Sequence, residues 1–106
     1  MAAFIISRVV VHDRDLMSKY IAASVPLAKS HGAKYRARAE DVVAADGEFP
    51  GGRVVIIEFP TLEDLKAFVY SPEYQEIRKL RLQSTESHVW IVPGEDSGAA
   101  GMNGLL

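Results

Sequence analysis

Cysteine is missing from all 106 residues of the chain. Its absence excludes disulfide bonds, thiolate zinc sites, cysteine-ligated iron–sulfur clusters and a cysteine nucleophile. Chains without disulfides are typical of reducing compartments, so we expect a cytoplasmic protein. An excess of positive charge is missing as well, because 12 lysines and arginines stand against 14 aspartates and glutamates. Without that excess we expect neither a nucleic-acid partner nor attachment to a membrane.

Long apolar runs and the familiar catalytic motifs are also lacking. No stretch approaches the roughly 18 apolar residues needed to span a bilayer, and residues 1–8 carry no positively charged leader region. There is no glycine-rich phosphate loop and no nucleophile elbow. The three histidines, His12, His31 and His88, lie too far apart in sequence to suggest a metal site. We therefore expect no metal and no cofactor.

The residues that are present have the composition of an ordinary globular domain, with 48% hydrophobic and 25% charged residues. A chain of this length has room for one core only. We place the domain at residues 1–94 and a C-terminal tail at residues 95–106, whose composition is typical of a flexible segment. Its apolar residues are suited to docking on a neighbouring subunit: Met102, Leu105 and Leu106.

Four segments rich in β-branched and aromatic residues predict strands, at residues 3–12, 34–39, 53–59 and 87–92. Three helices are predicted from their start signals, which are Asp13, Thr61 with Asp64, and Ser71 followed by Pro72. The first helix carries one apolar face, made of Leu16, Tyr20, Ala23 and Leu27. Within that helix Pro26 predicts a kink or two abutting helices.

The order of these elements predicts the fold. Strand, helix, two strands, helix, a further helix and a last strand form the ferredoxin-like βαββαβ arrangement. This is an α+β fold in which helices cover one face of a four-stranded antiparallel sheet. The other face of such a sheet is expected to be polar wherever it meets water.

The predicted strands do not follow that expectation, because both of their faces are apolar. In the first strand Ile5 and Val9 alternate with Phe4, Ile6 and Val10. An apolar second face needs a cover of its own, and in so short a chain the simplest cover is a second copy. We therefore predict a homodimer.

Several motifs resemble a known family. They are Ile57-Glu58-Phe59-Pro60, the helix that leads into Ser71-Pro72-Glu73-Tyr74-Gln75 and on to Leu80-Arg81, and His31-Gly32 with Tyr35 and Arg38. Together they resemble domain-of-unknown-function family 1330, over roughly residues 2–94. That family belongs to the dimeric α/β-barrel superfamily. The resemblance implies two ferredoxin-like subunits whose sheets face each other, and a pocket for a small molecule.

The implied functions are broad, since the superfamily includes cofactor-free monooxygenases, isomerases, dehydratases, haem-handling enzymes and ligand-sensing domains. A fold of this kind does not determine which of them applies. The chain also departs from the family in one place. Phe68-Val69 stands where the family often has Trp-Tyr, and Tyr70 precedes the Ser-Pro turn. If those aromatic residues shape a ligand wall, the pocket of this chain differs.

Six residues are candidates for a site. His31, Glu58 and Tyr74 are candidates for proton transfer, and Arg38, Ser71 and Arg81 for ligand binding. Each has a structural alternative. His31 can cap a helix, Glu58 can pair with Arg38 or Arg81, and Tyr74 can belong to the core. Arg38 shares its predicted strand face with Lys34 and Arg36, which is either a cationic row for an anion or a solvated strand edge.

The leading hypothesis is a small-molecule-binding homodimer, with a cofactor-independent enzyme for a small anionic or carbonyl-bearing compound as its catalytic form. The alternative is a non-catalytic ligand-sensing or protein-interaction module, in which the same charges form structural ion pairs. A closed cavity with an unpaired Arg38 and a desolvated Glu58 or His31 supports the first hypothesis. Arginine–glutamate pairs that fill the cavity support the second.

Overall fold

The computed structural model describes residues 1–95, and the predicted tail beyond them, with Met102, Leu105 and Leu106, lies outside the described residues. Seven elements follow one another: β1 (Ala3–Val11), α1 (Arg14–Ser30), β2 (Lys34–Ala39), β3 (Arg53–Phe59), α2 (Leu62–Val69), α3 (Pro72–Ser84) and β4 (Thr85–Pro93). The predicted order of elements is confirmed. The last strand is longer than predicted by two residues at its start and one at its end.

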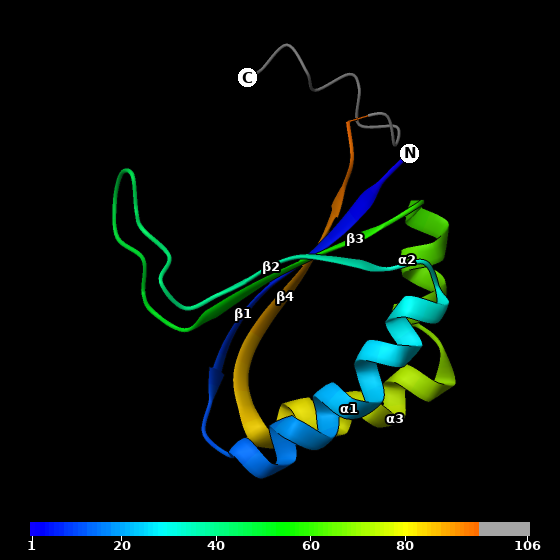
Figure 1. Cartoon of the computed structure of the whole chain (residues 1–106), viewed down its shortest axis with the longest axis horizontal. Helices are drawn as coiled ribbons and strands as arrows, with labels where there is room; N and C mark the ends of the chain where they lie inside the picture. Colours follow the sequence, from blue (N-terminus) through cyan, green and yellow to red (C-terminus); the bar gives the residue numbers. More distant parts are fainter. Residues whose placement is uncertain (96–106) are drawn as a thin grey trace.

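The four strands form one antiparallel sheet in the order β2-β3-β1-β4. All three helices lie on one face of this sheet, and the β2–β3 loop extends away from its edge (Figure 1). The predicted ferredoxin-like α+β fold is therefore confirmed. The cavity described below lies on the face that the helices cover. No helix in the described part of the chain is both long and apolar enough to cross a bilayer.

The predicted helix starts are the observed ones. The Asp13 carboxylate accepts a hydrogen bond from the backbone N–H of Leu16 at 3.1 Å. Helix α1 begins at Arg14, the residue after Asp13. Ser71 caps α3 in the same way, with its hydroxyl oxygen 3.1 Å from the N–H of Tyr74. Each cap satisfies a backbone donor that has no partner inside its helix. The Ser71 cap also fixes the position of Tyr74, whose side chain lies between the sheet and the helices.

The division of α1 at Pro26 did not occur, because one helix continues through this residue to Ser30. Pro26 lies on an exposed side of α1, and so does Ala22, whose carbonyl loses its helical partner to the proline ring. At the surface, water can donate the missing hydrogen bond to the Ala22 carbonyl. The buried residues of α1 are Met17, Ser24 and Ala28. Each of them directly follows a residue of the predicted apolar face, so the buried face is shifted by one position in the sequence.

The core lies between the helices and one end of the sheet. Phe59 and Leu65 are fully buried, and Phe68 stacks on Phe59 with ring centroids 5.5 Å apart. Gly32 ends α1 with φ +86°, a backbone conformation that side-chain-bearing residues rarely adopt. A Cβ at this position would lie 2.7 Å from a ring carbon of Pro60, so the turn into β2 requires glycine.

A β-bulge in β2 overturns the prediction that Lys34, Arg36 and Arg38 share a strand face. Between Tyr35 and Ala37 the register against β3 shifts, and Arg36 becomes an extra residue with no ladder partner. Arg38 therefore pairs with Val55 and faces the helices, together with Tyr35. Arg36 forms an ion pair with Glu58, its Nε 3.1 Å from the carboxylate oxygen Oε1.

The helix-free face of the sheet carries an apolar patch over β1 and β4, as the apolar residues on both faces of the predicted strands suggest. Phe4 and Ile6 of β1 pair with Val92 and Trp90 of β4 on this face. Trp90 is 49% exposed, and Val10 and Val92 are more than a third exposed. A large aromatic residue in an apolar patch of this kind is typical of an association surface.

Candidate functional site

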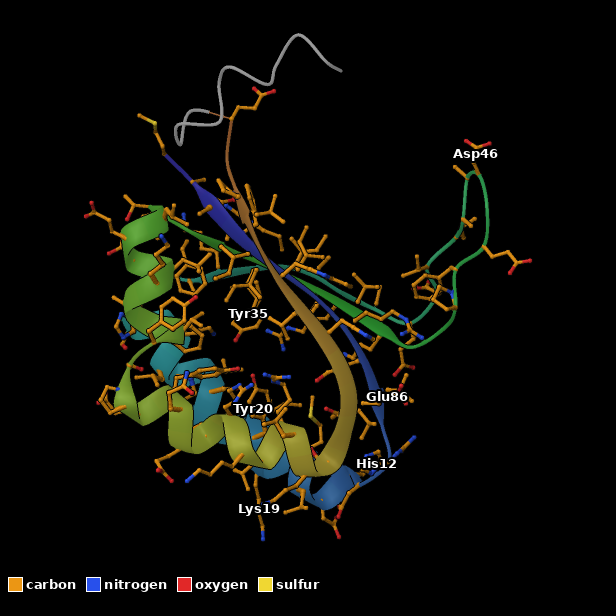
Figure 2. All side chains as sticks on the ribbon, turned by 180° about the vertical axis from the view of Figure 1, so that it is seen from behind. His12, Lys19, Tyr20, Tyr35, Asp46 and Glu86 are labelled. Carbon is orange, nitrogen blue, oxygen red and sulfur yellow. The ribbon has the colours of Figure 1, made fainter. Side chains whose placement is uncertain are left out.

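A cavity of about 770 Å³ lies between the sheet and the helices. Its volume is within the range of sites that enclose a small organic molecule. Strand residues such as Ile5, Ile57 and Ile91 form an apolar wall of the cavity. Phe68 and Val69 of α2 also line it. In Figure 2, Tyr35 from β2 and Tyr20 from α1 lie between sheet and helices, whereas neighbouring Lys19 points away from the sheet.

The charged side chains along this cavity all carry the same sign. Four arginines contribute to its lining, Arg38, Arg53, Arg78 and Arg81, and none of its described lining residues is an aspartate or a glutamate. None of these arginines forms an ion pair within residues 1–95. A concave surface with fixed positive charge and apolar walls attracts anions, because low-dielectric walls concentrate the field.

Arg81 is the most constrained of the four. It lies in the last turn of α3 and is only 8% exposed, although arginine is rarely buried without a partner of opposite charge. One terminal nitrogen, Nη1, donates to the Ser87 hydroxyl at 2.6 Å. The Nε–H is buried and has no hydrogen-bond partner in the described part of the chain. A buried donor without an acceptor is costly, so this guanidinium has an unused capacity for an anionic oxygen.

Two phenols meet in the same cavity. The hydroxyl oxygens of Tyr20 and Tyr74 are 2.9 Å apart, and the two rings pack edge to face with centroids 6.4 Å apart. Burial raises the pKa of Tyr20, and the neighbouring Tyr74 raises it further, while the positive charge of Arg81 acts in the opposite direction. Tyr20 therefore keeps its proton at neutral pH and serves as a neutral hydrogen-bond donor.

Tyr35 adds a third phenol on the sheet side. The guanidinium carbon of Arg38 lies 4.4 Å from the centre of the Tyr35 ring, at cation–π distance. Burial raises the pKa of Tyr35, and Arg38 partly opposes that effect. The cavity thus presents guanidinium and phenol donors from β2, α1 and α3, and the charged acceptors to match them are absent from its described lining.

Three of the six predicted site residues line this cavity: Arg38, Tyr74 and Arg81. The other three are absent from its lining. Glu58 faces the helix-free side, where it pairs with Arg36 rather than with Arg38 or Arg81. His31 ends α1 with its ring against Phe68, and Ser71 uses its hydroxyl for the cap of α3. The structure does not bring these three together with the arginines.

The sequence analysis missed Tyr20 as a site residue, because its spacing on α1 marked it only as part of a buried stripe. The available signal was the phenol hydroxyl on a helix face predicted to be buried, since a buried phenol needs a hydrogen-bond partner. Arg53 and Arg78 gave no signal beyond that of ordinary surface charges. In the described residues there is no group of three potential ligands placed to hold a metal ion.

The model of one family, described as a domain of unknown function (DUF1330), matches residues 2–95. The chain belongs to this family. The resemblance based on the motifs around Ser71-Pro72 and His31-Gly32 is thereby confirmed. No curated protein matches the chain significantly.

Solved structures share the fold of this DUF1330 chain at low sequence identity. A protein of unknown function from Rhodopseudomonas palustris is 17% identical, with a TM-score of 0.70 over 87% of this chain and 81% of that one. A dimeric ferredoxin-like protein of unknown function from Jannaschia sp. CCS1 is 13% identical, with a TM-score of 0.67 over 87% and 98%. SnoaB, a cofactor-independent oxygenase from Streptomyces nogalater, is 8% identical, with a TM-score of 0.60 over 88% and 92%. At these identities the likeness shows the fold.

Proposed function

We propose that this DUF1330 chain is a small-molecule-binding homodimer whose ligand is an organic anion with an apolar body. The observation that carries the proposal is Arg81, a buried guanidinium that has no acidic partner in residues 1–95 and that contributes to a cavity whose described lining has no carboxylate. An anionic oxygen would complete its hydrogen bonds, and the wall formed by residues such as Ile5 and Ile57 would take up the apolar part.

The alternative of an interaction module with a filled pocket has less support. In that case arginine–glutamate pairs would occupy the space between sheet and helices. The one arginine–glutamate ion pair within residues 1–95, Arg36–Glu58, lies on the helix-free face instead. Arg38 also has no acidic partner within residues 1–95. Its positive charge is therefore available to a ligand.

The homodimer part of the proposal rests on the helix-free face. Its exposed apolar residues include Trp90, Val10 and Val92, which a second copy would remove from water. Several solved proteins with this fold are dimers according to their descriptions. A catalytic form of the proposal, without a cofactor, would use the Tyr20–Tyr74 pair as its proton donor in place of His31 or Glu58.

Binding of a simple probe tests the proposed ligand class. Phenylpropanoate carries one carboxylate and an aromatic body, and phenylpropanamide is its neutral analogue. Isothermal titration should show binding of the acid and at least about tenfold weaker binding of the amide. Replacing Arg81 by methionine should weaken phenylpropanoate binding by about tenfold or more, because the buried charge is lost.

Arg36→Met is the matched control, since it removes the same charge from the helix-free face. It should leave phenylpropanoate binding unchanged. Equal binding of acid and amide, or equal effects of the two arginine substitutions, would contradict the proposed function. Native mass spectrometry of the purified protein should in addition show a dimer and any ligand it retains.

A further inference from the structure

We infer that the cavity selects α-keto carboxylates, with Arg81 binding the carboxylate and the Tyr20–Tyr74 hydroxyl pair binding the keto oxygen. This inference rests on the proposed function, because it takes the anion at Arg81 as given. It adds a second recognition element, which neither the family description nor the structural neighbours supply.

The count of donors in the Tyr20–Tyr74 pair leads to this ligand class. The two hydroxyls are 2.9 Å apart, so one of them donates its proton to the other. The proton of the second hydroxyl then remains unused within the pair. Both phenols line the cavity together with Arg81, and their polar tips are turned to each other between sheet and helices. A ligand oxygen is the acceptor that this remaining proton lacks.

The cavity brings the pair and Arg81 together, since Tyr20, Tyr74 and Arg81 all contribute to its lining, and Tyr74 and Arg81 are both buried residues of α3. The charge of Arg81 acts on the Tyr20 phenol, and Tyr20 and Tyr74 act on each other, so the three groups form one electrostatic unit. A carboxylate bound by the Arg81 guanidinium would have its α-carbon substituent near the phenols, because the three side chains line one cavity. The substituent on the α-carbon is therefore the part of the ligand that meets the phenols.

The type of oxygen follows from the excess of donors. A keto oxygen only accepts hydrogen bonds, so it satisfies a phenol proton and brings no new donor into the site. An α-hydroxy group brings a proton of its own into a cavity whose charged groups are all donors. A plain methylene offers the phenol proton no acceptor, so it lacks the hydrogen bond that a keto oxygen gains. The expected order of affinity is keto, then hydroxy, then methylene.

A series of three probes measures this preference in the wild-type chain. Phenylpyruvate, phenyllactate and phenylpropanoate share the carboxylate and the aromatic ring, and they differ only at the α-carbon. Isothermal titration should give about tenfold tighter binding for phenylpyruvate than for phenylpropanoate, the value of one well-placed hydrogen bond. Phenyllactate should fall between them.

The double variant Tyr20→Phe/Tyr74→Phe removes both hydroxyls and keeps both rings. It should bind phenylpyruvate and phenylpropanoate about equally, while its affinity for phenylpropanoate stays within about twofold of wild type. Ser30→Ala is the control, because it removes an exposed hydroxyl at the end of α1, outside the lining of the cavity. It should retain the preference for phenylpyruvate. A thermal melt of each variant establishes that it is folded.

The outcomes separate this inference from the proposed function. If wild type binds phenylpropanoate through Arg81 but does not prefer phenylpyruvate, the proposed function stands and the α-keto inference is overturned. A preference that survives in the double variant, or that disappears in Ser30→Ala, overturns the inference as well. If none of the three carboxylates binds to wild type, both are overturned. Should the double variant fail to fold, the wild-type order of affinity alone decides.

Discussion

Two arginines on the same short strand, Arg36 and Arg38, show how differently the two faces of the sheet are used. Arg36 lies on the helix-free face and has a carboxylate partner, Glu58. Arg38 lies on the helix side and contacts an aromatic ring, Tyr35, with no acidic partner in residues 1–95. At these two positions the helix-free face neutralises the charge of its arginine within the chain, whereas the helix side keeps the positive charge of Arg38 available.

The same contrast extends to the hydrophobic residues of the two faces. Phe59 on the helix side is fully buried by the chain itself. Trp90 on the helix-free face is half exposed, although His88 stacks beside it and Ile6 pairs with it across the sheet. The comparison teaches that one side of the sheet forms a core and a cavity, while the other side is complete only when something covers it.

The largest expected effect tests the core side. Phe59→Ala should lower the free energy of unfolding by about 3–5 kcal/mol, because it leaves a cavity among Leu65, Phe68 and their neighbours. Urea denaturation measures this loss. Phe4→Ala on the helix-free face is the comparison, and its cost should depend on protein concentration if a second copy covers that face. Equal, concentration-independent costs would remove the distinction between the faces.

A charge introduced on the helix-free face, at Trp90 of the edge strand β4, tests the proposed association. Trp90→Glu should weaken the dimer by about a hundredfold or more, since it places a carboxylate in an apolar contact. Native mass spectrometry and sedimentation velocity measure the change. Trp90→Phe is the control that keeps an aromatic ring and should remain dimeric. A Trp90→Glu variant that dimerises as tightly as wild type would contradict the assignment of this face.

Alkaline pH tests the phenols of the cavity side. Burial raises the pKa of Tyr20 in the folded chain, so above pH ~10 the unfolded chain loses this proton while the folded chain keeps it. Tyr20 should therefore lower the free energy of unfolding by up to about 1.4 kcal/mol for each pH unit above that point, and leave it unaffected below. Urea denaturation at neutral and alkaline pH measures the slope.

In this measurement Tyr20→Phe should have a shallower alkaline slope than wild type. Tyr35→Phe should reduce the slope as well, because burial also raises the pKa of Tyr35. A wild-type slope in Tyr20→Phe would show that the Tyr20 phenol is not buried as the structure has it.

The smallest expected effect belongs to the ion pair on the helix-free face. Arg36→Ala should change the free energy of unfolding by less than about 1 kcal/mol, because the side chains of Arg36 and Glu58 are 50% and 29% exposed and water screens the pair. Thermal or urea denaturation of the variant measures this value. A loss of several kcal/mol would mean that the pair is enclosed, for example by a second copy.

Half of the residues predicted for a site line the cavity. The spacing of seven residues between Tyr74 and Arg81 puts both on one face of α3, and both line the cavity. The alternation of β3 puts Glu58 beside Val54 and Ile56, but spacing could not show that this face lacks the helices. The partner of Tyr74, Tyr20, is 54 residues away in sequence. A contact of that kind depends on how two helices lie against each other, and no local pattern encodes it.

The sequence by itself determined the local features: where helices begin, at Asp13, Thr61 and Ser71, and the order of strands and helices that makes the ferredoxin-like fold. Those features depend on neighbouring residues and on alternation, which are readable one segment at a time. Only the tertiary structure decided which side of the sheet receives Arg38, because a single extra residue in β2 reverses the alternation at the bulge. It also decided that a buried guanidinium and two phenols share one cavity, since their convergence requires the whole chain to be packed.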